Sequence, residues 1–148
     1  MKSESVVRLR PAELADSDRL FAWQTEPNAR QYFHNTAVPS RHEHESWFAR
    51  RLTMNDPRMW IIEASGQPVG YVRLDPTDGQ CEMSVSIMVS SSGRKGGYAG
   101  AALRLLRQLV PNDRFVAEVR SDNLVSQRLF ESVGYVRAAE HTYVNDPA

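Results

Sequence analysis

The pattern of apolar and polar residues predicts one strand and two helices at the start of the chain. Residues 6–10, VVRLR, form an expected strand. Apolar residues then recur at helical intervals over residues 14–23, where Asp16 and Ser17 are available as helix caps. Residues 40–43, SRHE, match a capping box that precedes an apolar helical face, so a second helix is expected to begin there.

Three antiparallel strands are expected in the middle of the chain. Residues 59–64 and 69–74 are apolar runs on either side of a tight turn, which is typical of a hairpin. Residues 80–89 alternate cleanly, so their side chains point to opposite sides of a third strand. One side carries Met83, Val85, Ile87 and Val89, and the other carries Glu82, Ser84, Ser86 and Met88.

The last third of the chain predicts two helices, each followed by strand. A helical apolar period begins at Tyr98, and residues 115–120 read as a strand. Asp122 or Asn123 caps the next helix, and residues 135–144 supply one or two final strands. The resulting order, β-α-α-β-β-β-α-β-α-β-β, predicts an α/β fold in which helices flank both faces of a mixed sheet.

Composition and charge narrow the class of protein. The chain has 148 residues, of which 41% are hydrophobic and 24% charged, so one globular domain spanning residues 1–148 is expected. The 18 basic and 18 acidic residues cancel, which argues against a general nucleic-acid binder and against attraction to an anionic membrane. One cysteine, no signal-like apolar run and no stretch of membrane-spanning length predict a soluble cytoplasmic protein. The four histidines lack ligand spacing, so no metal site is expected.

The segment most informative about chemistry is residues 90–100, SSSGRKGGYAG, between a strand and a strong helix. Small residues let backbone N–H groups converge, the helix N-terminus adds positive potential, and Arg94 and Lys95 add mobile charge. Together these features predict a pyrophosphate cradle. The alternative is a flexible connection with two solvated cations. The spacing fits neither the nucleotide-kinase P-loop nor the dinucleotide fingerprint.

Two motifs resemble those of one superfamily. Residues 94–99, RKGGYA, match Arg/Gln-x-x-Gly-x-Gly/Ala, the acetyl-CoA signature of the GCN5-related N-acetyltransferases (GNAT). Residues 123–135, NLVSQRLFESVGY, are similar to the family's later block. The resemblance covers essentially the whole chain. It implies a GNAT fold: a mostly antiparallel sheet of six to seven strands, splayed at the coenzyme A (CoA) cleft and flanked by about four helices.

The resemblance also implies where acetyl-CoA binds. Met88 and Val89 would hold the pantetheine arm, amides from Lys95 to Gly100 the pyrophosphate, and Asn123 and Ser126 would lie near the thiol. Many relatives have a general-acid tyrosine where this chain has Phe130, which cannot donate a proton. Tyr143 or Tyr98 could replace it. The implied cofactor set is Met88, Val89, Arg94, Lys95, Gly96, Gly97, Tyr98, Ala99, Gly100, Asn123, Ser126 and Phe130.

Acetyl transfer to an amine needs a base, and three residues are candidates. Glu118 lies on the strand before Asn123, beside the expected thiol end, and ranks first; Glu82 is second. A carboxylate on an otherwise buried strand is unusual, although a structural ion pair with an arginine explains it equally well. His44 is the third candidate, with a surface-packed histidine as the alternative.

The N-terminal half bears on the acetyl acceptor. Trp23, residues 28–30 and residues 44–48 resemble the pattern of acetyltransferases that modify nucleotide-linked amino sugars, and RimJ/RimL-type protein acetyltransferases are similar too. Arg30 and Arg73 could fork onto a diphosphate, although Arg73 could equally pair with Glu82. Trp23 and Trp47 could equally belong to the hydrophobic core. The implied substrate set is Trp23, Arg30, His44, Trp47 and Arg73.

The sequence thus favours an enzyme that moves an acetyl group from acetyl-CoA to a primary amine of a small molecule by direct attack in a ternary complex. A nucleotide-linked amino sugar is the leading acceptor, and an arginine-lined groove would favour it. A protein N-terminus, another small amine or an antibiotic is the alternative. A CoA-binding protein without catalysis is the rival of another class. The resemblance also suggests a homodimer.

Overall fold

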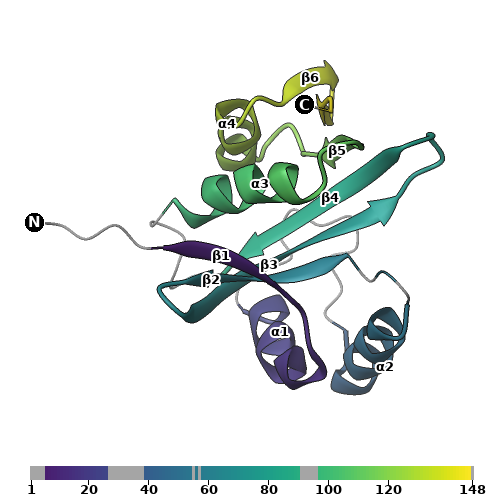
Figure 1. Ribbon diagram of the computed structural model, residues 1–148, viewed down its shortest axis with the longest axis vertical. Coiled ribbons are helices and arrows are strands. Elements are labelled where there is room, and N and C mark those ends of the chain that lie inside the picture. Colours follow the sequence, from purple (N-terminus) through teal and green to yellow (C-terminus); the bar gives the residue numbers. More distant parts are fainter. Residues whose placement is uncertain (1–5, 27–38, 55, 57, 91–96, 148) are drawn as a thin grey trace, which may run out of the picture.

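The computed structural model describes residues 6–26, 39–54, 56, 58–90 and 97–147, which form seven strands and four α-helices (Figure 1). No helix among them is long and apolar enough to cross a membrane. A short 3₁₀ turn over Leu14–Asp16 precedes the first helix. The elements are β1 (Val7–Pro11), α1 (Ser17–Gln24), α2 (Arg41–Leu52), β2 (Met59–Ala64), β3 (Gln67–Pro76), β4 (Glu82–Val89), α3 (Tyr98–Leu109), β5 (Arg114–Glu118), α4 (Leu124–Ser132), β6 (Val136–Ala139) and β7 (Thr142–Asn145).

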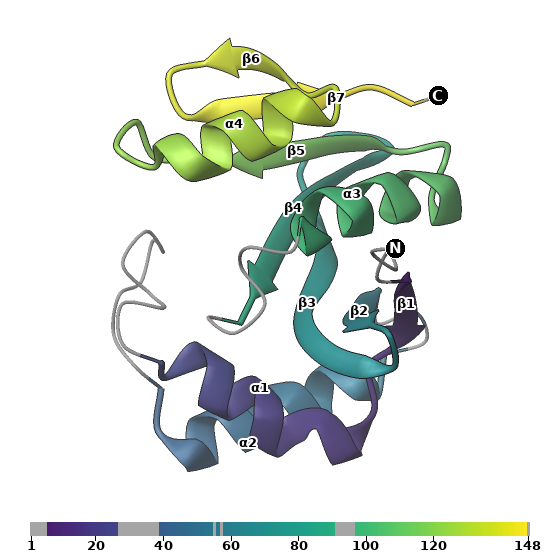
Figure 2. The ribbon, with the colours of Figure 1, turned by 90° about the vertical axis from the view of Figure 1, so that its left-hand side faces the viewer.

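The strands form one sheet in the order β1-β2-β3-β4-β5-β7-β6. Every neighbouring pair is antiparallel except β4 and β5, which are parallel. The helices α1 and α2 lie on one side of the sheet and α3 and α4 on the other (Figure 2). The structure therefore confirms the predicted mixed, mostly antiparallel sheet with helices on both faces.

Each face of the sheet has its own apolar core. Val72 and Val85 point toward α3 and α4, whereas Tyr71 and Met88 point toward α1 and α2. This division follows from strand geometry, because successive side chains of β3 and β4 leave the sheet on opposite sides. The alternation predicted for β4 is therefore confirmed.

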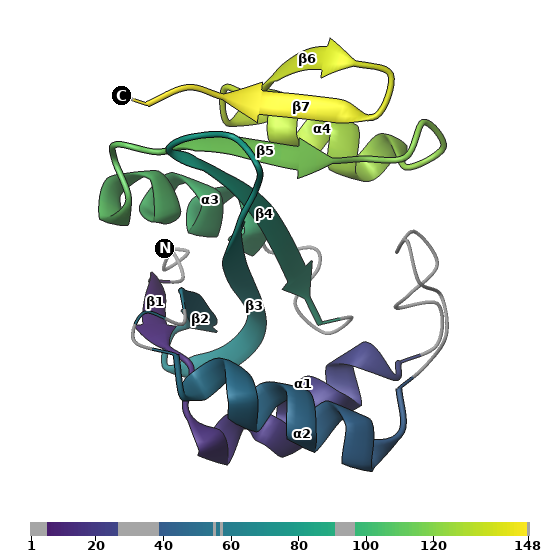
Figure 3. The same ribbon diagram turned by 90° about the vertical axis from the view of Figure 1, so that its right-hand side faces the viewer.

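The strands β4 and β5 separate after a short contact. They pair at three positions, Glu82 with Arg114, Met83 with Phe115 and Ser84 with Val116. Beyond these pairs β4 continues beside β3 to Val89, whereas β5 continues beside β7. Figure 3 shows the two strands diverging from their common end. The splayed sheet implied by the resemblance is present.

Gly70 allows β3 to approach β4 closely near this divergence. A Cβ built on Gly70 would lie 2.1 Å from the carbonyl oxygen of Met88 and 2.8 Å from Cα of Val89. No side chain fits there, because a Cβ does not approach another atom so closely. Gly70 therefore fixes the path of the last part of β4.

The structure corrects one predicted helix cap. Asp16 makes no side-chain cap bond to α1. Its buried carboxylate instead accepts two hydrogen bonds of 2.8 Å from the guanidinium of Arg10 and a further one from Arg19. Such a side chain is an ion-pair anchor between β1 and the start of α1. The capping box at α2 is confirmed, since Ser40 and Glu43 exchange both bonds.

Candidate active site

The backbone of β4 at Ile87 faces the gap, by which we mean the space between β4 and β5 beyond their last paired residues. The N–H of Ser90 donates to the carbonyl oxygen of Val69 at 2.7 Å, so Ser90 and, two residues back, Met88 turn their backbone groups toward β3. The N–H and carbonyl of Ile87 and of Val89 consequently point toward the gap. The expectation for Met88 is corrected, because its backbone pairs with β3 and its side chain is buried. Sequence reasoning missed Ile87.

The helix α3 begins beside the end of β4 with features suited to an anion. Gly97 has a φ of 72°, in the left-handed region that glycine adopts without strain. Nothing in the described part of the chain lies within 4 Å of a Cβ built on it. The first turn, which contains the predicted residues Tyr98, Ala99 and Gly100, holds no acidic residue, and its N–H groups lack helical partners. The predicted Arg94, Lys95 and Gly96 lie outside the described residues.

The start of α4 brings two predicted residues together. The side-chain oxygen of Asn123 accepts a hydrogen bond of 3.2 Å from the N–H of Ser126, which confirms the predicted helix cap. Phe130, later in the same helix, is buried and packs against Tyr135 with ring centroids 4.9 Å apart. Phe130 therefore lies in the α3–α4 core rather than at an open surface.

The two tyrosines considered as proton donors differ in their surroundings. Tyr143 on β7 is buried, and its hydroxyl donates to Glu131 at 3.4 Å. Tyr98 is half-buried at the first position of α3, directly after the loop that follows β4. Of the two, only Tyr98 lies beside the gap, so Tyr143 is poorly placed for the predicted role.

The two candidate glutamates stand at opposite ends of the divergence. Glu118 ends β5 and is exposed, which differs from the buried position that the sequence suggested. Since Ser84 pairs with Val116, continuing that register by two residues would set Glu118 level with Ser86, across the gap. Glu82 lies at the closed end, where its carboxylate accepts a hydrogen bond of 2.7 Å from the hydroxyl of Thr77. Glu82 therefore supports a turn.

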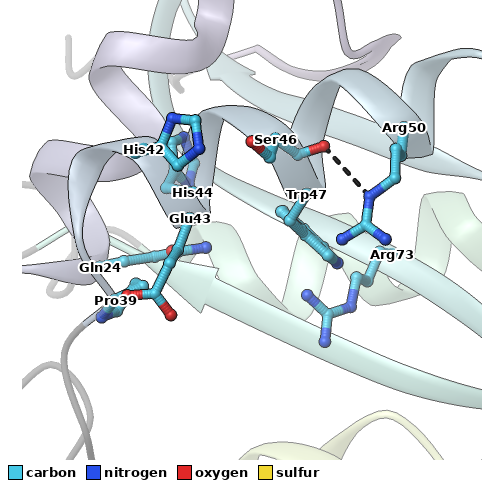
Figure 4. A pocket seen from close by; sticks show the side chains of 9 residues that line it. All are labelled: Gln24, Pro39, His42, Glu43, His44, Ser46, Trp47, Arg50 and Arg73. Carbon is cyan, nitrogen blue, oxygen red and sulfur yellow. Dashed lines mark hydrogen bonds between the residues drawn. The ribbon is translucent and has the colours of Figure 1, made fainter.

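A pocket of about 580 Å³ opens between α2 and β3, on the same sheet face as Ser84, Ser86 and Glu118 (Figure 4). Most of its lining comes from one side of α2, whose start the capping box fixes. Sequence reasoning predicted three of the lining residues and missed six. The lining consists of Gln24, Pro39, His42, Glu43, His44, Ser46, Trp47, Arg50 and Arg73.

Two arginines line this pocket beside Trp47. The guanidinium carbon of Arg73 lies 5.3 Å from the ring centroid of Trp47, and its Nε donates to Asp75 at 3.0 Å. The Nε of Arg50 donates to the carbonyl oxygen of Ser46 at 3.4 Å. The alternative of a structural carboxylate partner for Arg73 holds, but the partner is Asp75 rather than Glu82, since Ser86 stands opposite Arg73. Arg50 was detectable in the sequence, because it follows Trp47 by three residues and so shares its helix face.

His44 is a packed residue between α1 and α2. Its ring is 2% exposed, its Nε2 lies 3.0 Å from the carbonyl oxygen of Ser17, and it stacks on Phe48 with centroids 5.9 Å apart. Burial lowers the pKa of this imidazole below its ordinary value. Both Nδ1 and Nε2 are enclosed, so His44 is poorly placed to take a proton from a substrate.

The other three residues predicted for the acceptor, Trp23, Trp47 and Arg30, differ in their positions. Trp23 is buried in the core between the sheet and α1, so the core alternative holds for it. Trp47 is half-buried and lines the pocket. Arg30 lies outside the described residues.

The site thus combines a splayed pair of strands, a helix end suited to an anion, and a pocket between α2 and β3. The model of the acetyltransferase (GNAT) domain family matches residues 7–136. The chain belongs to this family, as its two motifs predicted. It is an N-acetyltransferase, and its acetyl donor is acetyl-CoA.

Solved structures with the same fold span nearly the whole chain. RimL, the ribosomal L7/L12 α-N-protein acetyltransferase solved with coenzyme A, has a TM-score of 0.81 and 15% identity over 95% of this chain and 94% of its own. The aminoglycoside acetyltransferase AAC(6')-Ib, solved with coenzyme A and kanamycin, has a TM-score of 0.79 and 17% identity over 95% of this chain and 95% of its own. The microcin C7 self-immunity acetyltransferase MccE, solved with acetyl-CoA and AMP, has a TM-score of 0.77 and 16% identity over 95% of this chain and 92% of its own. Among curated proteins no match is found. At these identities the likeness shows the fold.

Proposed function

We propose that this acetyltransferase modifies a primary amine on a small molecule that also carries a phosphate group, with nucleotide-linked amino sugars as the leading class. The observation that carries the proposal is the pocket that Arg50, Arg73 and Trp47 line together, with Arg73 over the indole ring. Guanidinium groups fork onto phosphate oxygens, and an indole offers a flat apolar surface to a sugar or base. The AMP bound by MccE, a structural neighbour, is consistent with a nucleotide acceptor.

The chain's own residues fit the donor. Gly97 and the first turn of α3 offer backbone N–H groups to a pyrophosphate, and Ile87 offers backbone groups to a pantetheine arm that would run along the edge of β4 toward Val89. Asn123 and Ser126 would lie toward the thiol. Acetyl-CoA supplies the thioester carbonyl that the amine attacks. The N–H of Ile87 is the strand donor placed to polarise such a carbonyl.

Proton transfer falls to the residues around the gap. We assign the base to Glu118, which is exposed at the end of β5, two residues beyond the last pair of β5 with β4. It takes the proton of the attacking amine directly or through one water molecule. The departing sulfur leaves as a thiolate and takes its proton from water, because Tyr98 stands in the turn that would bind the pyrophosphate, away from the thiol end. The amine attacks directly in a ternary complex, with no acetylated residue between donor and acceptor.

Calorimetry with acetyl-CoA tests the donor site. The Gly97→Glu variant places a carboxylate where the pyrophosphate would lie, so binding seen with the wild-type protein should be lost. Gly97→Asn is the matched control, because asparagine tolerates the left-handed backbone without adding charge. Unchanged binding by a folded Gly97→Glu variant would refute the assignment of this loop.

A panel of amines then tests the acceptor class. Turnover of amino-sugar phosphates or nucleotide-linked amino sugars, in preference to unphosphorylated amines, supports the proposal. Preference for a peptide N-terminus would favour a protein N-terminal acetyltransferase, and preference for a polycation would favour an antibiotic or polyamine enzyme. Binding of acetyl-CoA without turnover of any amine would favour a non-catalytic protein.

A further inference from the structure

Asp75, on β3, divides its carboxylate between two arginines. One oxygen accepts from Nη1 of Arg51, and the other accepts from Nε of Arg73 at 3.0 Å. Arg51 on α2 is 9% exposed, and its Nη2 donates to the carbonyl oxygen of Leu74 at 2.8 Å. A buried guanidinium held by both a carboxylate and a backbone carbonyl is a rigid support. It therefore fixes the direction in which Asp75 presents its second oxygen.

This support determines how Arg73 enters the pocket. Its Nε is taken by Asp75, and its guanidinium lies over the ring of Trp47 (Figure 4). Within the part of the chain that the structure describes, its two terminal nitrogens have no hydrogen-bond partner. Arg50 has the same arrangement, with Nε bonded to the carbonyl of Ser46. Two anchored guanidinium groups thus offer terminal nitrogens to one pocket.

Arg51 also decides the charge of this cluster. An isolated pair of Asp75 and Arg73 would be neutral and would attract an anion weakly. With Arg51 as a third member, the cluster keeps a formal charge of +1, while the charges of Arg50 and Glu43 in the pocket wall formally cancel. The charge of Arg73 is therefore available to a ligand although its Nε is paired.

We infer that Asp75 is a positioning residue that makes the acceptor pocket specific for a phosphorylated amine, by holding Arg73 so that it and Arg50 together bind the phosphoryl group. The inference rests on the proposed function. Asp75 does not itself touch the acceptor. Its effect passes through Arg73, and Arg51 keeps it in place. A bidentate contact of this kind depends on orientation as well as charge.

The test compares two acceptors that differ by one phosphate, glucosamine and glucosamine 1-phosphate. In the wild-type enzyme the KM for the phosphorylated amine should be the lower. Asp75→Asn keeps the size of the side chain. It should reduce the KM ratio, defined as the KM for glucosamine divided by the KM for glucosamine 1-phosphate, about tenfold, which corresponds to about 1.4 kcal/mol. The change should lie in KM rather than kcat, with acetyl-CoA binding unaffected.

Glu63→Gln is the matched control. Glu63 on β2 makes the same Nε contact of 3.0 Å with an arginine, Arg10, but does not line the pocket. It should leave the KM ratio unchanged. A fall of the ratio in both variants would point to a general loss of structure and would overturn the inference.

A double-mutant cycle separates positioning from direct contact. In an Arg73→Met background, Asp75→Asn should have no further effect on the KM ratio, since Asp75 acts through Arg73. If Asp75→Asn lowers the KM ratio by the same factor with and without Arg73, the inference is overturned. Because Asp75→Asn leaves Arg51 without its carboxylate, thermal unfolding checks the fold. Arg73→Lys leaves the Arg51–Asp75 pair intact and should lose the same preference, since lysine cannot present a fork.

Calorimetry with inorganic pyrophosphate distinguishes this inference from the proposed function. The Gly97→Glu change is present in every protein compared, so that the donor site does not contribute to pyrophosphate binding. If no amine is acetylated, weaker binding after Asp75→Asn in this background would still support the phosphoryl site. If amines are acetylated, equal wild-type KM values for the two acceptors would overturn the phosphoryl site and leave acetyl transfer standing.

Discussion

At the scale of single residues, the assignment of the base rests on the contrast between two glutamates. Glu118 is exposed across the gap from β4, whereas Glu82 is bonded to Thr77 in a turn. The two occupy strands that pair with each other and were equally plausible from their residue type. Register separates them: Glu118 ends β5 beyond the last pair with β4, whereas Glu82 stands at the paired end of the two strands and supports the connection between β3 and β4.

We expect Glu118→Gln to lower kcat by about a hundredfold or more, within the range that general bases contribute. Its affinity for acetyl-CoA, measured by calorimetry, should not change, since the proposed role of Glu118 is to take a proton from the amine and not to bind the donor. Glu82→Gln is the control and should leave kcat intact. Equal losses of kcat in the two variants would remove Glu118 from its proposed role.

Residue patterns predicted the parts of the site that depend on nearby sequence. The capping box at Ser40, the cap at Asn123 and the glycine at the start of α3 are all local features, and all are present. Pairing across strands was less accessible. Arg73 was expected to reach Glu82, but the turn between β3 and β4 sets Arg73 opposite Ser86. Its partner is Asp75, two residues along the same strand face.

At the scale of elements, the divergence of β4 from β5 depends on how closely β3 follows β4. The contact at Gly70 leaves no room for a Cβ, because the backbone carbonyl of Met88 occupies that space. Sequence periodicity identified both strands but could not show this approach, which is a property of register. The GNAT resemblance supplied the splay, whereas the geometry supplies its cause.

Gly70→Ala should therefore destabilise the protein by about 3 kcal/mol, because the clash is with backbone that cannot rotate away. Urea unfolding would measure the change. Gly79→Ala is the control, since a Cβ there meets only the side chain of Glu82, which can move. We expect it to change stability by less than about 1 kcal/mol. Similar costs for both would contradict the close approach of β3 and β4.

At the scale of the whole molecule, stability should depend on pH in two separate windows. Burial lowers the pKa of His44, so its stabilising effect is present above about pH 6.5, the ordinary value, and is lost as pH falls through the folded pKa. Burial alone would raise the pKa of Asp16, but hydrogen bonds from Arg10, Glu13 and Arg19 lower it below the ordinary 3.8. The effect of Asp16 is therefore lost only in stronger acid.

Urea unfolding across pH tests this separation. His44→Gln can still donate to the carbonyl of Ser17, and it should flatten the fall in stability just below pH 6.5. Asp16→Asn should alter the profile only at lower pH. The exposed His42, on the same helix, provides His42→Gln as a control. An unchanged slope in His44→Gln would show that His44 titrates alike in the folded and unfolded protein.

The gap between β4 and β5 also has a consequence for the life of the protein between reactions. Where two strands part, each presents unpaired backbone, and such edges recruit strands from other chains. Beyond the three β4–β5 pairs, we expect acetyl-CoA to cover these edges when it is bound. We expect the donor-free protein to self-associate more readily on heating than the protein with acetyl-CoA, which light scattering would show. Bound acetyl-CoA would then protect the enzyme from aggregation as well as supply the acetyl group.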